Sequence, residues 1–157
     1  DDLADWYIRL DRDESSSSES TAFSAWLAES EYRQKAHRDM VAGLDAVSAA
    51  TFDDTNWEQI LYWYESLYEL QPMPSHLLTM AVVCLQMNNY VKASFYFDKV
   101  NPQELEQRAY LYYAAKSDYY LQITDVKKAI EFIDLALDKV TNQLEKEYLE
   151  RKKSSSN

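Results

Sequence analysis

Few residues in this 157-residue sequence could do chemistry, and their spacing fits no metal site. The two histidines, His37 and His76, lie far apart in the chain. Neither has Cys, Asp or Glu neighbours at the spacing that a zinc site needs. We therefore expect no metal ligands here and interpret both histidines as ordinary surface or core residues.

Loop motifs that hold phosphates or present a nucleophile are excluded by composition. Gly43 is the only glycine, so neither a phosphate-cradling loop nor a Gly-x-Ser-x-Gly turn can form. Asp134 and Asp138 are one helical turn apart, but lysines surround them, which is typical of a solvated charged face. The sequence thus predicts a protein that is not an enzyme, with no catalytic residues and no cofactor.

The single cysteine and the hydropathy pattern bear on the compartment. Cys84 lies in the apolar stretch 81–85, which predicts a buried, inert thiol and rules out an intrachain disulfide. No apolar run is long enough to span a membrane, and no basic start precedes a hydrophobic segment. We expect a cytoplasmic protein in a reducing environment, without membrane association.

Negative charge is concentrated near the beginning of the chain. The net charge is −11, and residues 1–31 hold nine acidic and two basic residues. Such a balance opposes direct binding to nucleic acid or to anionic lipid, because both need Lys and Arg for neutralisation. A protein partner with a basic face is favoured.

Composition and periodicity together predict an all-α fold. One glycine and three prolines in a chain that is 46% hydrophobic favour long helices over the many turns of a β-sandwich. Apolar spacing divides the chain into an acidic three-helix module (1–50), a helical-repeat domain (51–153) and a frayed tail (154–157). Helices are expected at residues 2–12, 20–29, 32–47, 57–70, 74–87, 90–100, 104–123, 126–140 and from 142 onward.

Two helix starts carry strong capping signals. Asn101, Pro102 and Glu104 supply an N-cap, an N1 proline and an N3 acid, which predicts one long helix from 104 to about 123. Asn142 and Glu145 have the spacing of a capping box at the start of the last helix.

A degenerate internal repeat is visible at a shift of 36 residues. The shift superimposes small on small and large apolar on large apolar residues: Ala81 with Ser117, Ala93 with Ala129, Phe97 with Ile133, and Val100 with Ala136. Asn88 and Thr124 occupy the turns. The pattern resembles that of tetratricopeptide repeats, in which a small residue lets the two helices of a hairpin cross closely.

Thirteen tyrosines are more than the core of such a domain needs. Most aromatic residues at helical spacing are core residues. Tyr62 and Trp63, however, lie off the apolar stripe of their helix. Five tyrosines between 110 and 120 cover more than one face, so we expect some of them on a groove or an interface.

The first part of the chain resembles the N-terminal cytoplasmic module of FecR-like anti-sigma regulators. The likeness rests on Ala4, Trp6, Leu10, Phe23, Ala25 to Ala28, Tyr32, Arg33 and Ala36. This resemblance implies a three-helix piece that contacts an extracytoplasmic-function sigma factor. Under it, the candidates for core or sigma contact are Trp6, Leu10, Phe23, Trp26 and Leu27.

Residues 54–151 resemble the helical C-terminal extension of certain extracytoplasmic-function sigma factors. The residues concerned are Asp54 to Trp57, Ile60, Tyr64, Leu67, Leu70, Pro72 to Pro74, Ala114 to Asp118, Ala129, Ile130, Ala136, Leu137, Thr141, Asn142, Glu145 and Tyr148 to Arg151. Both resemblances imply a role in bacterial transcription regulation.

Two functional hypotheses follow. The first is a sigma-factor-linked, anti-sigma-like regulator that occludes its partner through the N-terminal module. The alternative is a generic tetratricopeptide-like scaffold or chaperone, whose groove takes a peptide along Leu78, Val82, Gln86, Asp118 and Gln122. The oligomeric state stays open under both.

Overall fold

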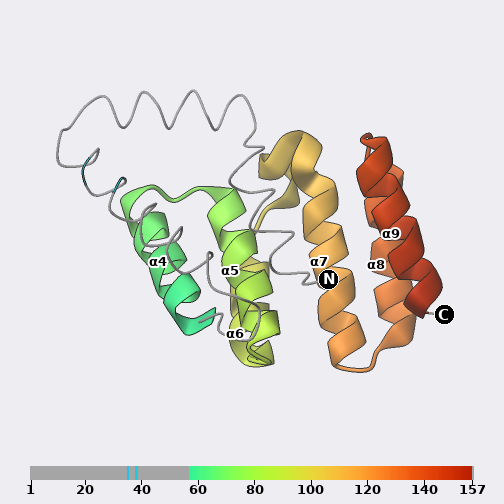
Figure 1. The fold of residues 1–157 in the computed structure, drawn as a ribbon, viewed down its shortest axis with the longest axis horizontal. Coiled ribbons are helices and arrows are strands. Elements are labelled where there is room, and N and C mark those ends of the chain that lie inside the picture. The colour runs from blue at the N-terminus through green and yellow to red at the C-terminus, as the bar shows by residue number, and fades with distance from the viewer. Residues whose placement is uncertain (1–34, 36–37, 39–56, 157) are drawn as a thin grey trace. The chain divides into compact units, whose positions relative to one another are not determined.

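The described part of the protein is helical throughout. The computed structural model describes Lys35, Arg38 and residues 57–156, and every regular element within residues 57–156 is a helix (Figure 1). The all-α prediction is confirmed for this part. Contacts divide the chain into two compact units, residues 1–96 and residues 97–157. The three-helix module predicted for residues 1–50 lies almost wholly outside the described residues.

The first unit contains α4 (Trp57–Leu70) and α5 (Pro74–Gln86), which pack side by side (Figure 1). Ile60, Leu61, Tyr64 and Leu67 form the buried stripe of α4, as their spacing predicts. On α5, ten residues from Ser75 to Leu85 are buried, so this helix has almost no solvent face. It is the core element of the first unit.

Pro74 sets the start of α5 locally. Pro74 occupies the first turn of α5, where a missing N–H costs nothing. Met73, just before it, has the extended conformation that a following proline imposes (φ −94°, ψ 136°). The break between α4 and α5 is therefore encoded locally.

Helix α6 (Tyr90–Lys99) is followed by a short 3-10 helix, η2 (Pro102–Arg108), and then by α7 (Ala109–Gln122). The prediction of one continuous helix from 104 to 123 is wrong. Asn101 does cap the start, because its side chain accepts from the Gln103 N–H, but Glu106 breaks the helix with φ 56° and ψ −125°. Leu105 and Arg108 are buried, so packing of this turn overrides the local helix signal.

In the second unit, α7 and α8 (Val126–Lys139) form an antiparallel hairpin, and α9 (Gln143–Ser156) packs against α8 (Figure 1). The hairpin crosses at small residues, as the repeat pattern predicts. Ser117 Oγ donates a buried 2.7 Å hydrogen bond to the Ala129 carbonyl. Helix α9 extends past residue 153, where we placed the boundary between repeat domain and tail.

Two interhelical turns have the same geometry at a separation of 36 residues. Asn88 (φ 58°) and Thr124 (φ 64°) are both left-handed, and the next residue in each turn donates its N–H to a carbonyl five residues back, at 2.9 and 2.8 Å. This is the Schellman arrangement that ends a helix. Asn89 and Asp125 then cap the following helices, accepting from the N–H of Lys92 and Lys128 at 3.1 Å.

The turn at Thr124 gives a first prediction. A β-branched residue in the left-handed region is strained, whereas glycine adopts it freely and asparagine tolerates it. We expect Thr124→Gly to raise the free energy of unfolding by about 0.5–1 kcal/mol in urea titration. Asn88→Gly, the matched control, should change it by less than about 0.5 kcal/mol. Destabilisation by Thr124→Gly would contradict the assignment of strain.

Candidate functional site

Six aromatic side chains form a closed ring of contacts, here called the aromatic seam, to which α6 contributes one residue, α7 four and α8 one. Successive rings contact one another with centroids 5.2–6.3 Å apart. Most of the pairs are edge to face, the arrangement that the ring quadrupole favours. In order around the ring, the members are Phe97, Tyr112, Tyr113, Phe132, Tyr120 and Tyr119.

Helix α7 places seam residues at helical spacing, and α8 contributes one ring between them. Tyr113 and Tyr120 are seven residues apart on α7, so they share a face, and Phe132 of α8 stacks on both at an interplanar angle of 28°. Phe97 is buried, whereas the other five rings are partly exposed. The seam therefore combines a buried anchor with accessible aromatic surface.

Three lysines lie over these rings. Lys116 Nζ is 5.3–5.8 Å from the centroids of four of them, those of Phe97, Tyr119, Tyr120 and Phe132. Lys128 Nζ lies 5.2 Å from the Tyr120 ring, and Lys139 Nζ lies 5.7 Å from the Tyr113 ring. These distances are those of cation–π contacts, so the seam positions three ammonium groups on one surface.

Polar contacts fix α9 against α7. The Tyr110 hydroxyl donates to the buried carboxylate of Glu145, and Lys152 forms an ion pair with Asp118, whose side chain is only 5% exposed. Burial lowers the pKa of Lys152 to about 7, while contact with the Asp118 carboxylate favours its charged form. Leu149, also on α9, is fully buried.

The start of α9 agrees only in part with the predicted capping box. The Asn142 side chain accepts from the N–H groups of Leu144 and Glu145 at 2.9 and 3.2 Å, as expected of an N-cap. The Glu145 carboxylate is used elsewhere, because it accepts the hydrogen bond from Tyr110. Glu145, which the sequence predicts as part of the capping box, thus forms a tertiary contact with α7 instead.

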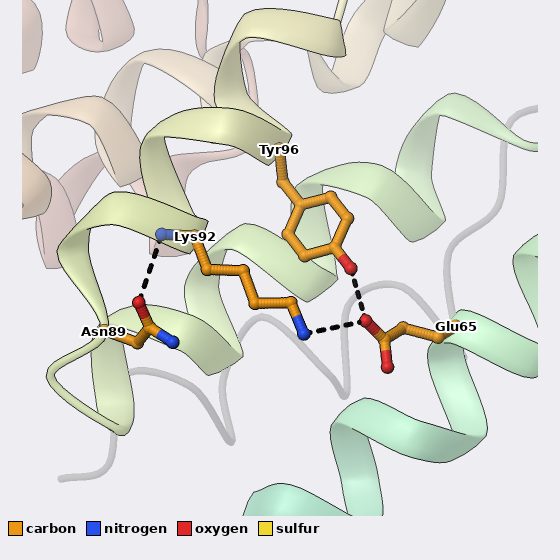
Figure 2. Close-up of polar contacts among 4 residues, drawn as sticks. All are labelled: Glu65, Asn89, Lys92 and Tyr96. Carbon is orange, nitrogen blue, oxygen red and sulfur yellow. Dashed lines mark hydrogen bonds and ion pairs between the residues drawn. The ribbon is translucent and has the colours of Figure 1, made fainter.

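The first unit holds a polar cluster between α4 and α6 (Figure 2). Glu65 of α4 accepts from the Tyr96 hydroxyl and pairs with Lys92 Nζ at 3.1 Å, both residues coming from α6. Burial and the hydrogen bond to Glu65 raise the pKa of Tyr96. The cluster joins two helices through contacts among its own polar side chains, so we interpret it as structural.

Cys84 is buried, as predicted, and is a free thiol. Burial raises its pKa from 9.0 to about 11, with Lys92 opposing the shift and Glu65 adding to it. A thiol of this kind stays protonated at neutral pH and is a poor nucleophile.

The residues predicted to line a peptide groove fall in both units. Leu78 and Val82 are buried on α5, and Gln86 is partly exposed at its end. Asp118 is buried in its pair with Lys152, whereas Gln122 is exposed. A groove that joins these five residues stays a prediction.

The predicted sigma contacts cannot be placed. Trp6, Leu10, Phe23, Trp26 and Leu27 lie outside the described residues.

The tyrosines that we expect outside the core are found at the surface. Tyr62 is 57% exposed, and four of the five tyrosines between 110 and 120 are partly exposed seam members. Tyr110 is the exception, because it is buried.

Sequence reasoning missed the seam lysines and the Asp118–Lys152 pair. A signal was present only for Lys116, which is four residues from Tyr120, whereas Lys128 and Lys139 contact rings of the facing helix. The pair has no such signal, because its members lie 34 residues apart in sequence.

Comparisons with known proteins give no relative. No protein-family model matches the chain, and no match is found among curated proteins or solved structures.

In the part of the chain that the structure describes, no three His, Cys, Asp or Glu side chains are grouped to hold a metal ion. None of the helices described is both long and apolar enough to cross a bilayer.

The Cys84 thiol predicts a pH dependence of stability. Its pKa is raised in the folded state, so the unfolded chain loses the thiol proton first as the pH rises. The stabilisation is complete below pH 9.0 and is lost towards about pH 11, by up to about 3 kcal/mol. Urea unfolding across this range should show a steeper decline for the natural chain than for Cys84→Ala. Parallel declines would refute the assignment.

The two ion pairs of α9 predict unequal effects. Asp118→Asn removes the carboxylate partner of Lys152 in a mostly buried site, which should cost about 2–4 kcal/mol. Asp134→Asn, the matched control, removes the partner of Lys153, where Asp134 is 51% exposed, and should cost less than about 1 kcal/mol. Chemical denaturation at neutral pH measures both, and equal losses would contradict the burial argument.

Proposed function

We propose that this chain is a non-enzymatic protein-binding module and that it acts as a cytoplasmic, sigma-factor-linked regulator of the anti-sigma type in a bacterium. The aromatic seam is the observation that carries the protein-binding part. Five partly exposed rings on one side of a helical hairpin are more apolar surface than a solvent face needs, and aromatic residues are enriched at protein interfaces.

A tetratricopeptide-like architecture is part of this proposal. It is supported by the two Schellman turns 36 residues apart, each followed by a side-chain N-cap at the equivalent position. Equivalent residues are buried in both copies, including Ala93 with Ala129 and Phe97 with Ile133. Repeats of this kind hold other proteins on the surfaces that their helices leave open.

Helix α9 supports the same interpretation as a terminal cap. Its exposed residues include Lys146, Glu147, Glu150 and Arg151, and its contacts to the hairpin include two polar ones. A largely polar outer face on the last helix is what a terminal cap of a stack of hairpins needs, although Leu144 at its start is 76% exposed.

The link to sigma factors rests on the likeness of residues 3–44 to FecR-like regulators and on their acidity. Residues 1–31 carry a net charge of −7, which complements the basic surfaces that sigma factors present to DNA. Occlusion of such a surface is the mechanism we propose. Trp6, Leu10, Phe23, Trp26 and Leu27 are the candidate anchors.

A generic helical-repeat scaffold is the second candidate, and one observation favours it. The aromatic seam belongs to residues 97–132, outside the segment that resembles anti-sigma modules. A protein that binds its partner through the seam alone would need no sigma factor.

Partner capture separates the two candidates. Tagged full-length chain and a 49–157 fragment, the latter checked for helicity by circular dichroism, are used as baits, and bound proteins are identified by mass spectrometry. We expect a sigma factor with the full-length chain only, because the fragment lacks the acidic anchors. Capture of an unrelated protein equally by both baits would favour the scaffold hypothesis over the regulator hypothesis. Capture of no protein by either bait would refute the protein-binding module itself.

A further inference from the structure

The charge on the aromatic seam is unusual for this protein. The side chains of Lys92, Lys152 and Lys153 each pair with a carboxylate. The ammonium groups of Lys116, Lys128 and Lys139 instead contact rings, and within the described residues no carboxylate lies in ion-pair contact with them. In a chain with 27 acidic and 16 basic residues, three such lysines concentrate positive charge beside the rings, while the Asp98 carboxylate acts on the seam at Tyr112.

Contact with a ring does not neutralise a lysine. The quadrupole of the aromatic face attracts the cation and restrains it but supplies no negative charge. Lys128 and Lys139 are exposed, so their ammonium groups can take an anion on the side away from the ring. Tyr113 and Tyr120 are partly exposed, so their side chains can offer apolar contact beside each charge.

The net charge of the surrounding sequence also favours an acidic ligand. Residues 102–157 hold nine of the sixteen basic residues and have a net charge of −1, against −7 for residues 1–31. The second unit therefore repels an acidic ligand much less than residues 1–31 do.

We propose that the aromatic seam binds an acidic segment of a partner protein, with carboxylates on Lys128 and Lys139 and aromatic or apolar side chains on the rings between them. The proposal rests on the protein-binding function above and names the chemistry of one partner. It is separate from the sigma contact, which uses the N-terminal segment and a basic partner surface.

The geometry fixes the spacing of the ligand. Lys128 and Lys139 are eleven residues apart on α8, which corresponds to about 16 Å along a helix. An extended peptide covers that distance in about five residues. Acidic residues five apart, with aromatic residues between them, should therefore fit the seam.

The probe is a fluorescein-labelled synthetic peptide with glutamates five residues apart flanking phenylalanines, and its control has glutamine at each glutamate. Anisotropy is measured with the full-length chain at low salt and at about 0.3 M salt. We expect the acidic peptide to bind at least about tenfold more tightly than the glutamine peptide, with the difference shrinking at high salt.

Matched variants test the surface. The double variant Lys128→Gln/Lys139→Gln should weaken binding of the acidic peptide by about tenfold, since two charge pairs are removed at exposed sites. The control Lys127→Gln/Lys146→Gln removes the same charge from exposed lysines that lie outside the seam, and should weaken binding by less than about twofold. All four positions are partly or fully exposed, so thermal unfolding should be nearly unchanged.

Three results would overturn the proposal: equal binding of both peptides, equal losses in both double variants, or tight binding of a single-stranded oligonucleotide with the same lysine dependence. The last would make the seam a nucleic-acid site. Failure here is distinguishable from failure of the proposed function. A captured sigma factor retained by Lys128→Gln/Lys139→Gln, together with no peptide binding, refutes only the seam. Specific peptide binding, together with capture of proteins other than a sigma factor, refutes only the regulator.

Discussion

The close approach of α7 and α8 at Ser117 and Ala129 is the constraint on which the second unit depends. A side-chain hydroxyl can reach the backbone carbonyl of the facing helix only where no bulky residue separates them, and Ala114, Ala115 and Ala136 are fully buried around the crossing. A larger side chain there would force the helices apart. The large rings of α7 and the Phe132 ring of α8 therefore lie at positions other than this crossing, where they form the aromatic seam together with Phe97 of α6.

The face of α7 towards α9 is governed by a different requirement. Tyr110 and Asp118 are both buried, and a buried carboxylate without a partner would be costly. Glu145 and Lys152 meet them two helical turns apart along α9, so the polar groups fix its register as well as its contact. Buried ion pairs contribute little net stability but select one arrangement. A purely apolar face would allow α9 to slide.

Local signals in the sequence were sufficient for most helix ends. Pro74, Asn89, Asp125 and Asn142 begin helices for reasons contained within three residues, and their positions agree with expectation. The left-handed break at Glu106 was not predictable, because the capping signals at Asn101 and Glu104 set where a helix begins and not how far it continues. Its length is decided by burial of Leu105 and Arg108, which depends on residues distant in sequence.

In the candidate site, too, local spacing predicts one part of the arrangement, and packing between helices decides the rest. Helical spacing predicts that too many tyrosines crowd α7 for all to be buried, and the partly exposed seam agrees with this. Which lysines lie over rings and which pair with carboxylates depends on the facing helix: Lys152 and Lys153 are neighbours, yet one pairs with a buried aspartate on α7 and the other with an exposed aspartate on α8. The free positive charge of the seam is thus a property of the hairpin, not of its composition. In an acidic chain this separation matters, because lysines that have no ion-pair partner among the described residues keep a local positive potential that differs in sign from the net charge.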